Sequence, residues 1–263
     1  HGPSFGPFQG WATNALFCGA ERFAGRMTDH FVTVADAMRD QYLAAGISQA
    51  DDYTRIPSGF DLQPFLDAEN SPTKRASLGL SPGDFVVGKI ARLFELKGHD
   101  DLFAIAPRLA KRIPNIRFLL VGDGVWRGRF ERLAKEIGCD QNFIFTGLVP
   151  PSEIPSLVGV MDALVHLSRR EGLPRALPQA MAAAKPVVAF DCDGAGEVCL
   201  DGKTGHLIEP GDLPKLEERL AKLANDAPLR TALGQAGRKL VEEEFTVEQL
   251  VERQYELYKR LLA

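Results

Sequence analysis

The sequence lacks the features that mark membrane-spanning, nucleic-acid-binding and metal-clustering proteins. No apolar run approaches the ~18–20 residues that a membrane span needs. Lys and Arg number 31 against 35 Asp and Glu, a formal net charge of −4, so no general positive field exists to attract nucleic acid. The four cysteines show no CxxC spacing, which argues against a zinc site or a disulfide framework.

A signal peptide is also missing from the start of the sequence, where no charged segment precedes an apolar one. With its unpaired cysteines this predicts a cytoplasmic protein, and peripheral attachment to a membrane stays open. The chain begins with His1 rather than Met. We therefore expect an incomplete N-terminal part, either because the start is missing from the sequence or because the natural protein is reduced.

The chain does contain a regular alternation of apolar runs and amphipathic segments. Its 263 residues are 45% hydrophobic and 25% charged, as in a globular protein. Near-continuous apolar strands separated by helices predict an α/β fold with a doubly wound, Rossmann-like parallel sheet. We expect strands at 85–90, 116–121, 143–146, 163–167 and 186–190, helices at 99–112, 126–137, 152–158 and 173–184 between them, and three closing helices near 213–225, 227–243 and 246–262.

The same pattern predicts two unequal domains. We expect an incomplete N-terminal Rossmann-like domain, a turn-rich linker, one complete Rossmann-like domain and a C-terminal helix that packs back on the N-terminal part, at residues 1–54, 55–66, 67–245 and 246–263. The N-terminal part retains a strand and a helix but too few residues for a whole sheet. Their apolar faces should be left exposed, and either self-association or docking on the main domain would cover them.

Ligands of open parallel sheets bind beyond the carboxyl ends of the strands. Arg92 and Lys97 follow the first strand of the main domain and lead into a helix N-terminus. Two cations beside free backbone N–H groups suit a diphosphate, and ordinary surface charges are the alternative.

The turns after the next two strands are rich in glycine. Gly122 and Gly124 follow the second strand and would let a ligand approach the backbone, although a tight turn explains them equally well. Gly147 and Val149 follow the third strand and could offer backbone groups to a planar base, again with a simple turn as the alternative.

The segment after the fourth strand carries an acidic residue before a helix. Glu171 could accept hydrogen bonds from sugar hydroxyls, while Gly172 and Leu173 could donate N–H groups to phosphate. Gln179 lies about two helical turns further on a similar face. Alone, Glu171 is more often a partner of the helix dipole. Asp191-Cys192-Asp193 matches a three-residue metal-binding pattern, but we expect no metal site there.

Six motifs in family order make the chain resemble the group 1 glycosyltransferases, glycosyltransferase family 4, which have the GT-B fold. The resemblance is dense over residues 55–245. It extends weakly to His1-Gly2 and to residues 31–46. The motifs are Ile56-Pro57-Ser58-Gly59-Phe60-Asp61 with Phe65, Arg92 with Lys97-Gly98, Val121-Gly122-Asp123-Gly124, Glu171-Gly172-Leu173-Pro174 with Ala180-Met181-Ala182, Pro186-Val187-Val188-Ala189, and Thr204-Gly205 with Pro210-Gly211-Asp212.

This resemblance implies a retaining, metal-independent transfer of a hexosyl group from a UDP- or GDP-sugar to an unidentified acceptor, without a cofactor. Arg92 and Lys97 would bind the diphosphate, Glu171 the sugar hydroxyls, and His1 would face the sugar from the N-terminal domain. The donor phosphate would help to take the acceptor's proton.

The family's second glutamate is Gln179 in this chain. An amide still makes hydrogen bonds with ribose hydroxyls but lacks the charge, which weakens binding by ~1–2 kcal/mol. With the reduced N-terminal part, this leaves a second hypothesis, a nucleotide-sugar-binding module with little or no transferase activity.

Overall fold

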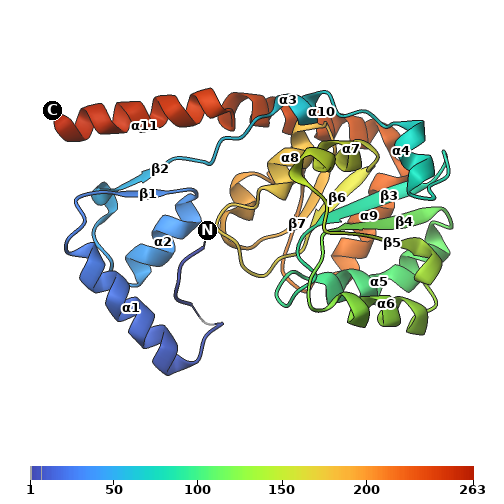
Figure 1. Ribbon diagram of the computed structural model, residues 1–263, viewed down its shortest axis with the longest axis horizontal. Helices are drawn as coiled ribbons and strands as arrows, with labels where there is room; N and C mark the ends of the chain where they lie inside the picture. The colour runs from blue at the N-terminus through green and yellow to red at the C-terminus, as the bar shows by residue number, and fades with distance from the viewer. Residues whose placement is uncertain (1, 7) are drawn as a thin grey trace.

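The computed structural model describes residues 2–6 and 8–263, which form two parallel sheets (Figure 1). The main sheet has six strands in the order β5-β4-β3-β6-β7-β8. These strands are β3 (Phe85–Ile90), β4 (Ile116–Val121), β5 (Phe143–Gly147), β6 (Ala163–His166), β7 (Val187–Phe190) and β8 (Gly205–Ile208). A small second sheet pairs β1 (Phe31–Thr33) with β2 (Tyr53–Arg55).

Helices cover both faces of the main sheet, and this burial explains its apolar strands. One face packs against α5 (His99–Arg112), α6 (Arg127–Glu136) and α9 (Leu213–Asn225). The other packs against α3 (Gln63–Leu66), α7 (Ile154–Gly159) and α8 (Ala176–Ala182). Two further helices are α4 (Pro72–Ser77) and α10 (Ala227–Glu244), and α10 contributes to both cores. The predicted α/β class and doubly wound parallel sheet are confirmed.

The structure departs from the predicted elements in several places. The strand β8 was missed, because its four residues include a glycine and a histidine and only pairing with β7 makes them a strand. The helix expected from residue 173 begins at Ala176. No strand was expected where β2 forms, at the junction of the N-terminal part and the predicted turn-rich linker, and β2 pairs with β1 in parallel.

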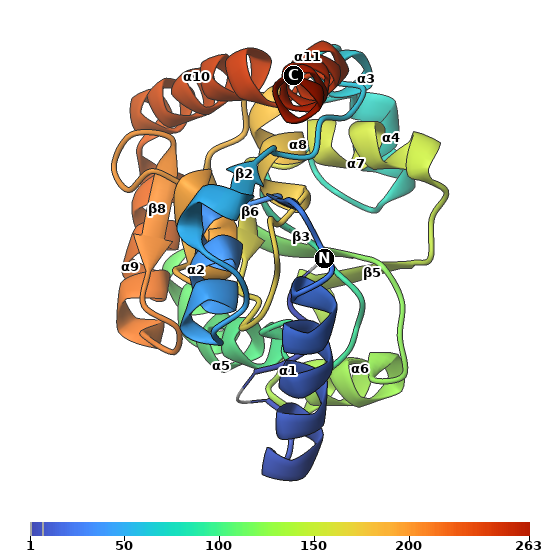
Figure 2. The same cartoon turned by 90° about the vertical axis from the view of Figure 1, so that its left-hand side faces the viewer.

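The N-terminal part exposes much of its apolar surface. On α1 (Trp11–Gly25), Trp11 and Leu16 are 86% and 70% exposed. The C-terminal helix α11 (Val247–Leu262) buries Leu257 but leaves Tyr255 and Tyr258 more than half exposed. This helix extends from α10 past β1 and β2 (Figures 1 and 2). Within the described ranges, no helix has both the length and the apolar character of a membrane span.

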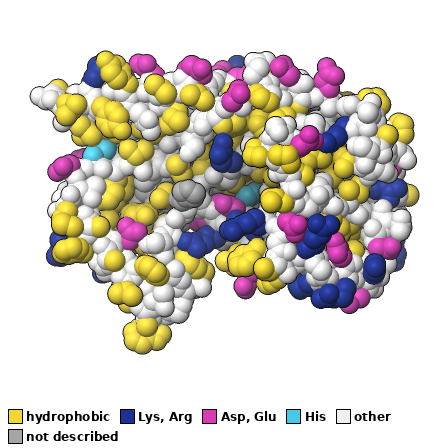
Figure 3. All heavy atoms as spheres, in the orientation of Figure 1, with side chains coloured by type: hydrophobic (Ala, Val, Ile, Leu, Met, Phe, Trp, Pro, Cys, Tyr) yellow, Lys and Arg dark blue, Asp and Glu magenta, His cyan; other side chains and the backbone are white. Residues whose placement is uncertain are grey.

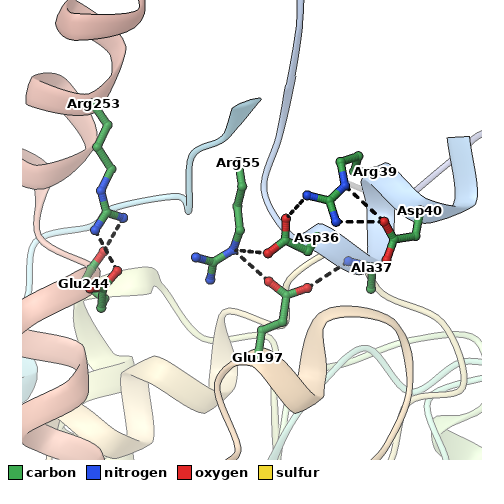
Figure 4. Close-up of polar contacts among 8 residues, drawn as sticks. All are labelled: Asp36, Ala37, Arg39, Asp40, Arg55, Glu197, Glu244 and Arg253. Atoms are coloured by element: carbon green, nitrogen blue, oxygen red, sulfur yellow. Dashed lines mark hydrogen bonds and ion pairs between the residues drawn. The ribbon is translucent and has the colours of Figure 1, made fainter. Parts of the chain in front are cut away.

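Polar contacts dock the N-terminal part on the main domain. In the short 3₁₀ helix Asp193–Glu197, the Glu197 carboxylate accepts a hydrogen bond from the backbone N–H of Ala37, at 2.9 Å, and pairs with Arg55, at 2.7 Å. Figure 4 shows this carboxylate between β2 and the start of α2 (Asp36–Ala44). Docking thus covers part of the face that we expected to be left open, and self-association stays a prediction.

Candidate functional site

The candidate site lies where the chain reverses its direction across the main sheet. From β3 the chain moves outward to β4 and β5, then returns to β6 beside β3 and continues to β8. The loops after β3 and β6 therefore leave neighbouring strands at the same edge, the usual ligand crevice of open α/β sheets. They are joined by a hydrogen bond from the Arg169 N–H to the Leu96 carbonyl, at 2.8 Å.

These two loops bring three cations and two carboxylates, those of Glu95 and Glu171, around a cavity of about 290 Å³. Its lining includes Arg92 and Lys97 from the loop after β3, and Arg170 and Glu171 from the loop after β6. The Lys97 ammonium donates a hydrogen bond to Glu171 Oε1 at 2.5 Å, and both side chains are about a fifth to a quarter exposed. Figure 3 shows Lys and Arg side chains gathered at a hollow in the middle of this face.

Glu171 also lines a second cavity, of about 550 Å³, on the other side of its loop. Gly172, Leu173 and Gln179 share this lining, as do His166 and Arg175. Every residue predicted after the fourth strand is therefore brought together here. Gly172 and Leu173 lie in the loop rather than at a helix N-terminus, because the hydrogen bonds of α8 start with Leu177 to Pro174 and Gln179 to Arg175.

Asp193 fixes the position of Glu171. Its Oδ2 accepts a hydrogen bond from the Glu171 N–H, and its Oδ1 accepts one from the Gln41 side chain, both at 2.6 Å. Asp193 holds this position with a left-handed φ of +50°. In the Asp191-Cys192-Asp193 motif, the Asp193 carboxylate therefore accepts hydrogen bonds from within the protein. In the described ranges, no group of three or more His, Cys, Asp or Glu side chains is arranged to hold a metal ion.

The glycines after β4 are required by the chain's own packing. A Cβ on Gly122 would lie 2.3 Å from the Ala91 carbonyl oxygen, and one on Gly124 would lie 2.4 Å from that of Leu93. The Gly122 N–H also donates to the Gly147 carbonyl at 3.2 Å. The loops after β3, β4 and β5 therefore stand side by side, with Gly147 at the end of β5 and Val149 in the loop that follows it.

Burial keeps one histidine of this region neutral. His166 Nε2 lies 3.8 Å from Glu171 Oε1, but burial, with Lys89 and Lys97 nearby, lowers the pKa of His166 to about 3. His166 is therefore not charged against Glu171 at neutral pH, and among the described residues Lys97 is the cation that pairs with this carboxylate.

The sequence did not predict two of the residues that line these cavities. The position of one predicted residue is not described by the structure. Arg170 and Arg175 flank the predicted Glu171 segment, so their adjacency to it was the available signal. His1 lies outside the described residues. Its neighbour Gly2 lines the smaller cavity.

A larger cavity, of about 640 Å³, adjoins this site from the N-terminal side. Phe5, Phe8 and Gln41 contribute to its lining, together with Arg170 and Asp193. Glu171 lines both smaller cavities and Lys97 lines one of them, so the candidate site is placed there.

Comparison with known proteins gives consistent matches. The family model for glycosyl transferases group 1 matches residues 70–240. A GDP-mannose-dependent alpha-(1-6)-phosphatidylinositol monomannoside mannosyltransferase of Mycolicibacterium smegmatis is 30% identical over 240 residues, 87% of this chain and 62% of that protein. A 2-deoxystreptamine glucosyltransferase of Streptomyces kanamyceticus is 31% identical over 185 residues, 68% of this chain and 46% of that protein.

Among solved structures, Anabaena HepE in complex with UDP and glucose has a TM-score of 0.85 and 25% identity, covering 97% of this chain and 69% of HepE. The chain spans less than two thirds of the length of the curated relatives described above. The family model nevertheless covers more than half of the chain, and the parallel sheet is that of its GT-B structural neighbours. The chain therefore belongs to the group 1 glycosyl transferase family.

Proposed function

We propose that this chain binds a nucleotide-diphosphate sugar at the junction of β3 and β6 and supplies the donor site of a retaining hexosyltransferase. The observation that carries this proposal is that Arg92, Lys97 and Arg170 line one cavity with Glu171, and that Lys97 donates a hydrogen bond to this carboxylate. The complexes of HepE with UDP and the GDP-mannose dependence of the mycobacterial relative support a nucleotide-sugar donor. They leave UDP and GDP as alternatives.

In this proposal the cations act on the leaving diphosphate. Arg92 and Lys97 bind its oxygens and neutralise the charge that develops as the bond to the sugar breaks. Lys97 first has to leave Glu171, and the carboxylate is then free to accept hydrogen bonds from the sugar hydroxyls. Gly172 and Leu173 offer N–H groups to the phosphates, and Gln179 faces the ribose.

The remaining parts of the donor follow from the arrangement of the loops. The base would lie beside Gly122, Gly124, Gly147 and Val149, next to the diphosphate loop. The sugar C1–oxygen bond to phosphate breaks and an acceptor oxygen bonds to C1 from the same face, so the anomeric configuration is retained. The acceptor's proton passes to a donor phosphate oxygen, and His1 would face the sugar. No metal or cofactor takes part in this scheme.

The alternative is a nucleotide-sugar-binding module with little transferase activity. It is favoured by Gln179, which stands where the family motif has a carboxylate.

Comparing donor hydrolysis with donor binding separates the two functions. UDP-glucose and GDP-mannose are titrated by calorimetry and then followed by NMR for release of free sugar. For the transferase we expect binding and slow hydrolysis, in the presence of EDTA, with the α-anomer released first. Binding without hydrolysis would support the module, and an inverted first product would contradict the retaining mechanism.

Restoring the family's second carboxylate tests whether residue 179 contacts the ribose of the donor. Gln179→Glu would add a charge-assisted acceptor for the ribose hydroxyls. We expect affinity for the preferred nucleoside diphosphate to rise up to about tenfold, equivalent to ~1.4 kcal/mol. Calorimetry with the 2′,3′-dideoxy nucleotide should show no gain.

Gln235→Glu, at an exposed position on α10, is the matched control. Equal gains for both nucleotides, or for both variants, would indicate a general electrostatic effect and contradict the ribose contact.

A further inference from the structure

A lysine is buried near the end of β3, the strand that leads into the candidate site. Lys89 is the one charged residue of β3, which lies between β4 and β6 in the sheet. Its side chain is only 1% exposed, and its Nζ has no hydrogen-bond partner within the described residues. An unpaired ammonium in such a place costs considerable free energy. Neither the proposed mechanism nor the family motifs above use this residue.

The charges around Lys89 are already paired with one another. Asp101, on the first turn of α5, receives two hydrogen bonds from Arg169, at 2.8 and 2.9 Å. Glu171 receives its hydrogen bond from Lys97. Both carboxylates that influence Lys89 thus pair with another cation, and within the described residues Lys89 Nζ has no anionic partner. A diphosphate between Arg92 and Lys97 would add negative charge that these cations do not already offset.

We propose that Lys89 is a positioning residue of the donor site, whose buried amine takes up a proton when a diphosphate binds above it. The resulting ammonium would hold the diphosphate in place from beneath while Arg92 and Lys97 contact it directly. This inference rests on the proposed function, because it requires that the anion of the donor binds here.

The protonation behaviour of the region is consistent with this role. Burial, assisted by Lys97, lowers the pKa of Lys89 to about 7, while Asp101 and Glu171 oppose the shift. A bound anion favours the charged form and raises this pKa again. Proton uptake is therefore expected at and above pH 7, and donor affinity should fall as the pH rises through this range.

The two other buried titratable groups facing this region are histidines. His99 on α5 and His166 on β6 have pKa values lowered by burial to about 2 and about 3. They are neutral in the same pH range, and far larger shifts would be needed to protonate them. Lys89 is therefore the group expected to take up the proton.

Calorimetry with UDP-glucose and GDP-mannose measures this uptake directly. Both phosphates of a sugar nucleotide are diesters, so the ligand itself does not titrate near neutral pH. Titrations at pH 8 in two buffers of different ionisation enthalpy should show uptake of up to about one proton by the wild-type chain. Affinity should fall by up to about tenfold per pH unit above pH 7.

Lys89→Met should abolish the uptake, flatten the pH dependence and weaken binding about tenfold at pH 7. Replacing a buried, unpaired amine by an apolar side chain of similar length should leave the thermal midpoint unchanged or higher. Lys185→Met is the matched control. This partly buried lysine precedes β7 at the opposite edge of the sheet, where its ammonium donates to the Gly159 carbonyl at 2.8 Å, and wild-type uptake should persist in the variant.

Binding without proton uptake in the wild-type chain would overturn the role of Lys89 and leave the proposed function intact. The same holds if Lys89→Met and Lys185→Met take up protons equally. Failure of the wild-type chain to bind either sugar nucleotide would contradict both the inference and the proposed function.

Discussion

The double variant Arg92→Ala/Lys97→Ala is expected to lose nucleoside-diphosphate affinity by about 10²–10⁴-fold while keeping its fold. Each hydrogen bond between a cationic side chain and a phosphate contributes ~1.5–3 kcal/mol, and two such losses give this range. Lys97 also balances Glu171 at 2.5 Å, so its removal leaves a carboxylate uncompensated beside the incoming anion. Calorimetric titration with UDP and GDP measures the loss.

Lys111→Ala/Arg112→Ala is the matched control, because it removes the same charge from two exposed residues at the far end of α5. The control should bind UDP or GDP like the wild-type chain. A similar loss in both double variants would show that only the overall charge matters, and unchanged binding in Arg92→Ala/Lys97→Ala would refute the diphosphate site.

Gly98→Ala is expected to be the most destabilising small substitution near the site. Gly98 precedes α5 with a φ of +64°, and a Cβ there would lie 1.9 Å from the Leu167 carbonyl oxygen. The loops after β3 and β6 would have to separate. Steric overlap added to left-handed backbone strain should cost ~3–5 kcal/mol of the free energy of unfolding. Thermal unfolding should show a midpoint lower by ~6–15 °C.

Gly79→Ala separates the two causes of this loss. Gly79 has almost the same φ, +69°, but a Cβ there would meet no atom within 4 Å. It should cost only the backbone strain, of ~1 kcal/mol. Equal costs at the two positions would contradict the close packing of the loop after β3 on the loop after β6.

The core of the site could be predicted because parallel strands display their following loops at one edge. Arg92, Lys97 and Glu171 each come shortly after an apolar run, and only the adjacency of β3 and β6 was needed to join them. The glycines were harder to interpret. Gly122 and Gly124 lie close to the chain's own carbonyl groups, a need that sequence cannot separate from the approach of a ligand.

Other features depend on contacts between distant segments and leave little trace in the sequence. Asp193 is 22 residues from Glu171, and its role as an acceptor for the Glu171 N–H follows only from the folded loops. The segment β8 is a strand because it pairs with β7. Its short, mixed sequence does not predict this pairing. Lys89 is visible in the sequence as a single charge in an apolar strand, but only the structure shows that its side chain is buried.

A crystal structure of the chain with bound UDP-glucose or GDP-mannose, whichever raises the thermal midpoint more, tests the account most directly. The account predicts the diphosphate between Arg92 and Lys97, the sugar hydroxyls on a Glu171 carboxylate released from Lys97, and the base beside the loops after β4 and β5. A sugar nucleotide held in the larger cavity near Phe5 and Phe8, with the hydrogen bond between Lys97 and Glu171 intact, would contradict it.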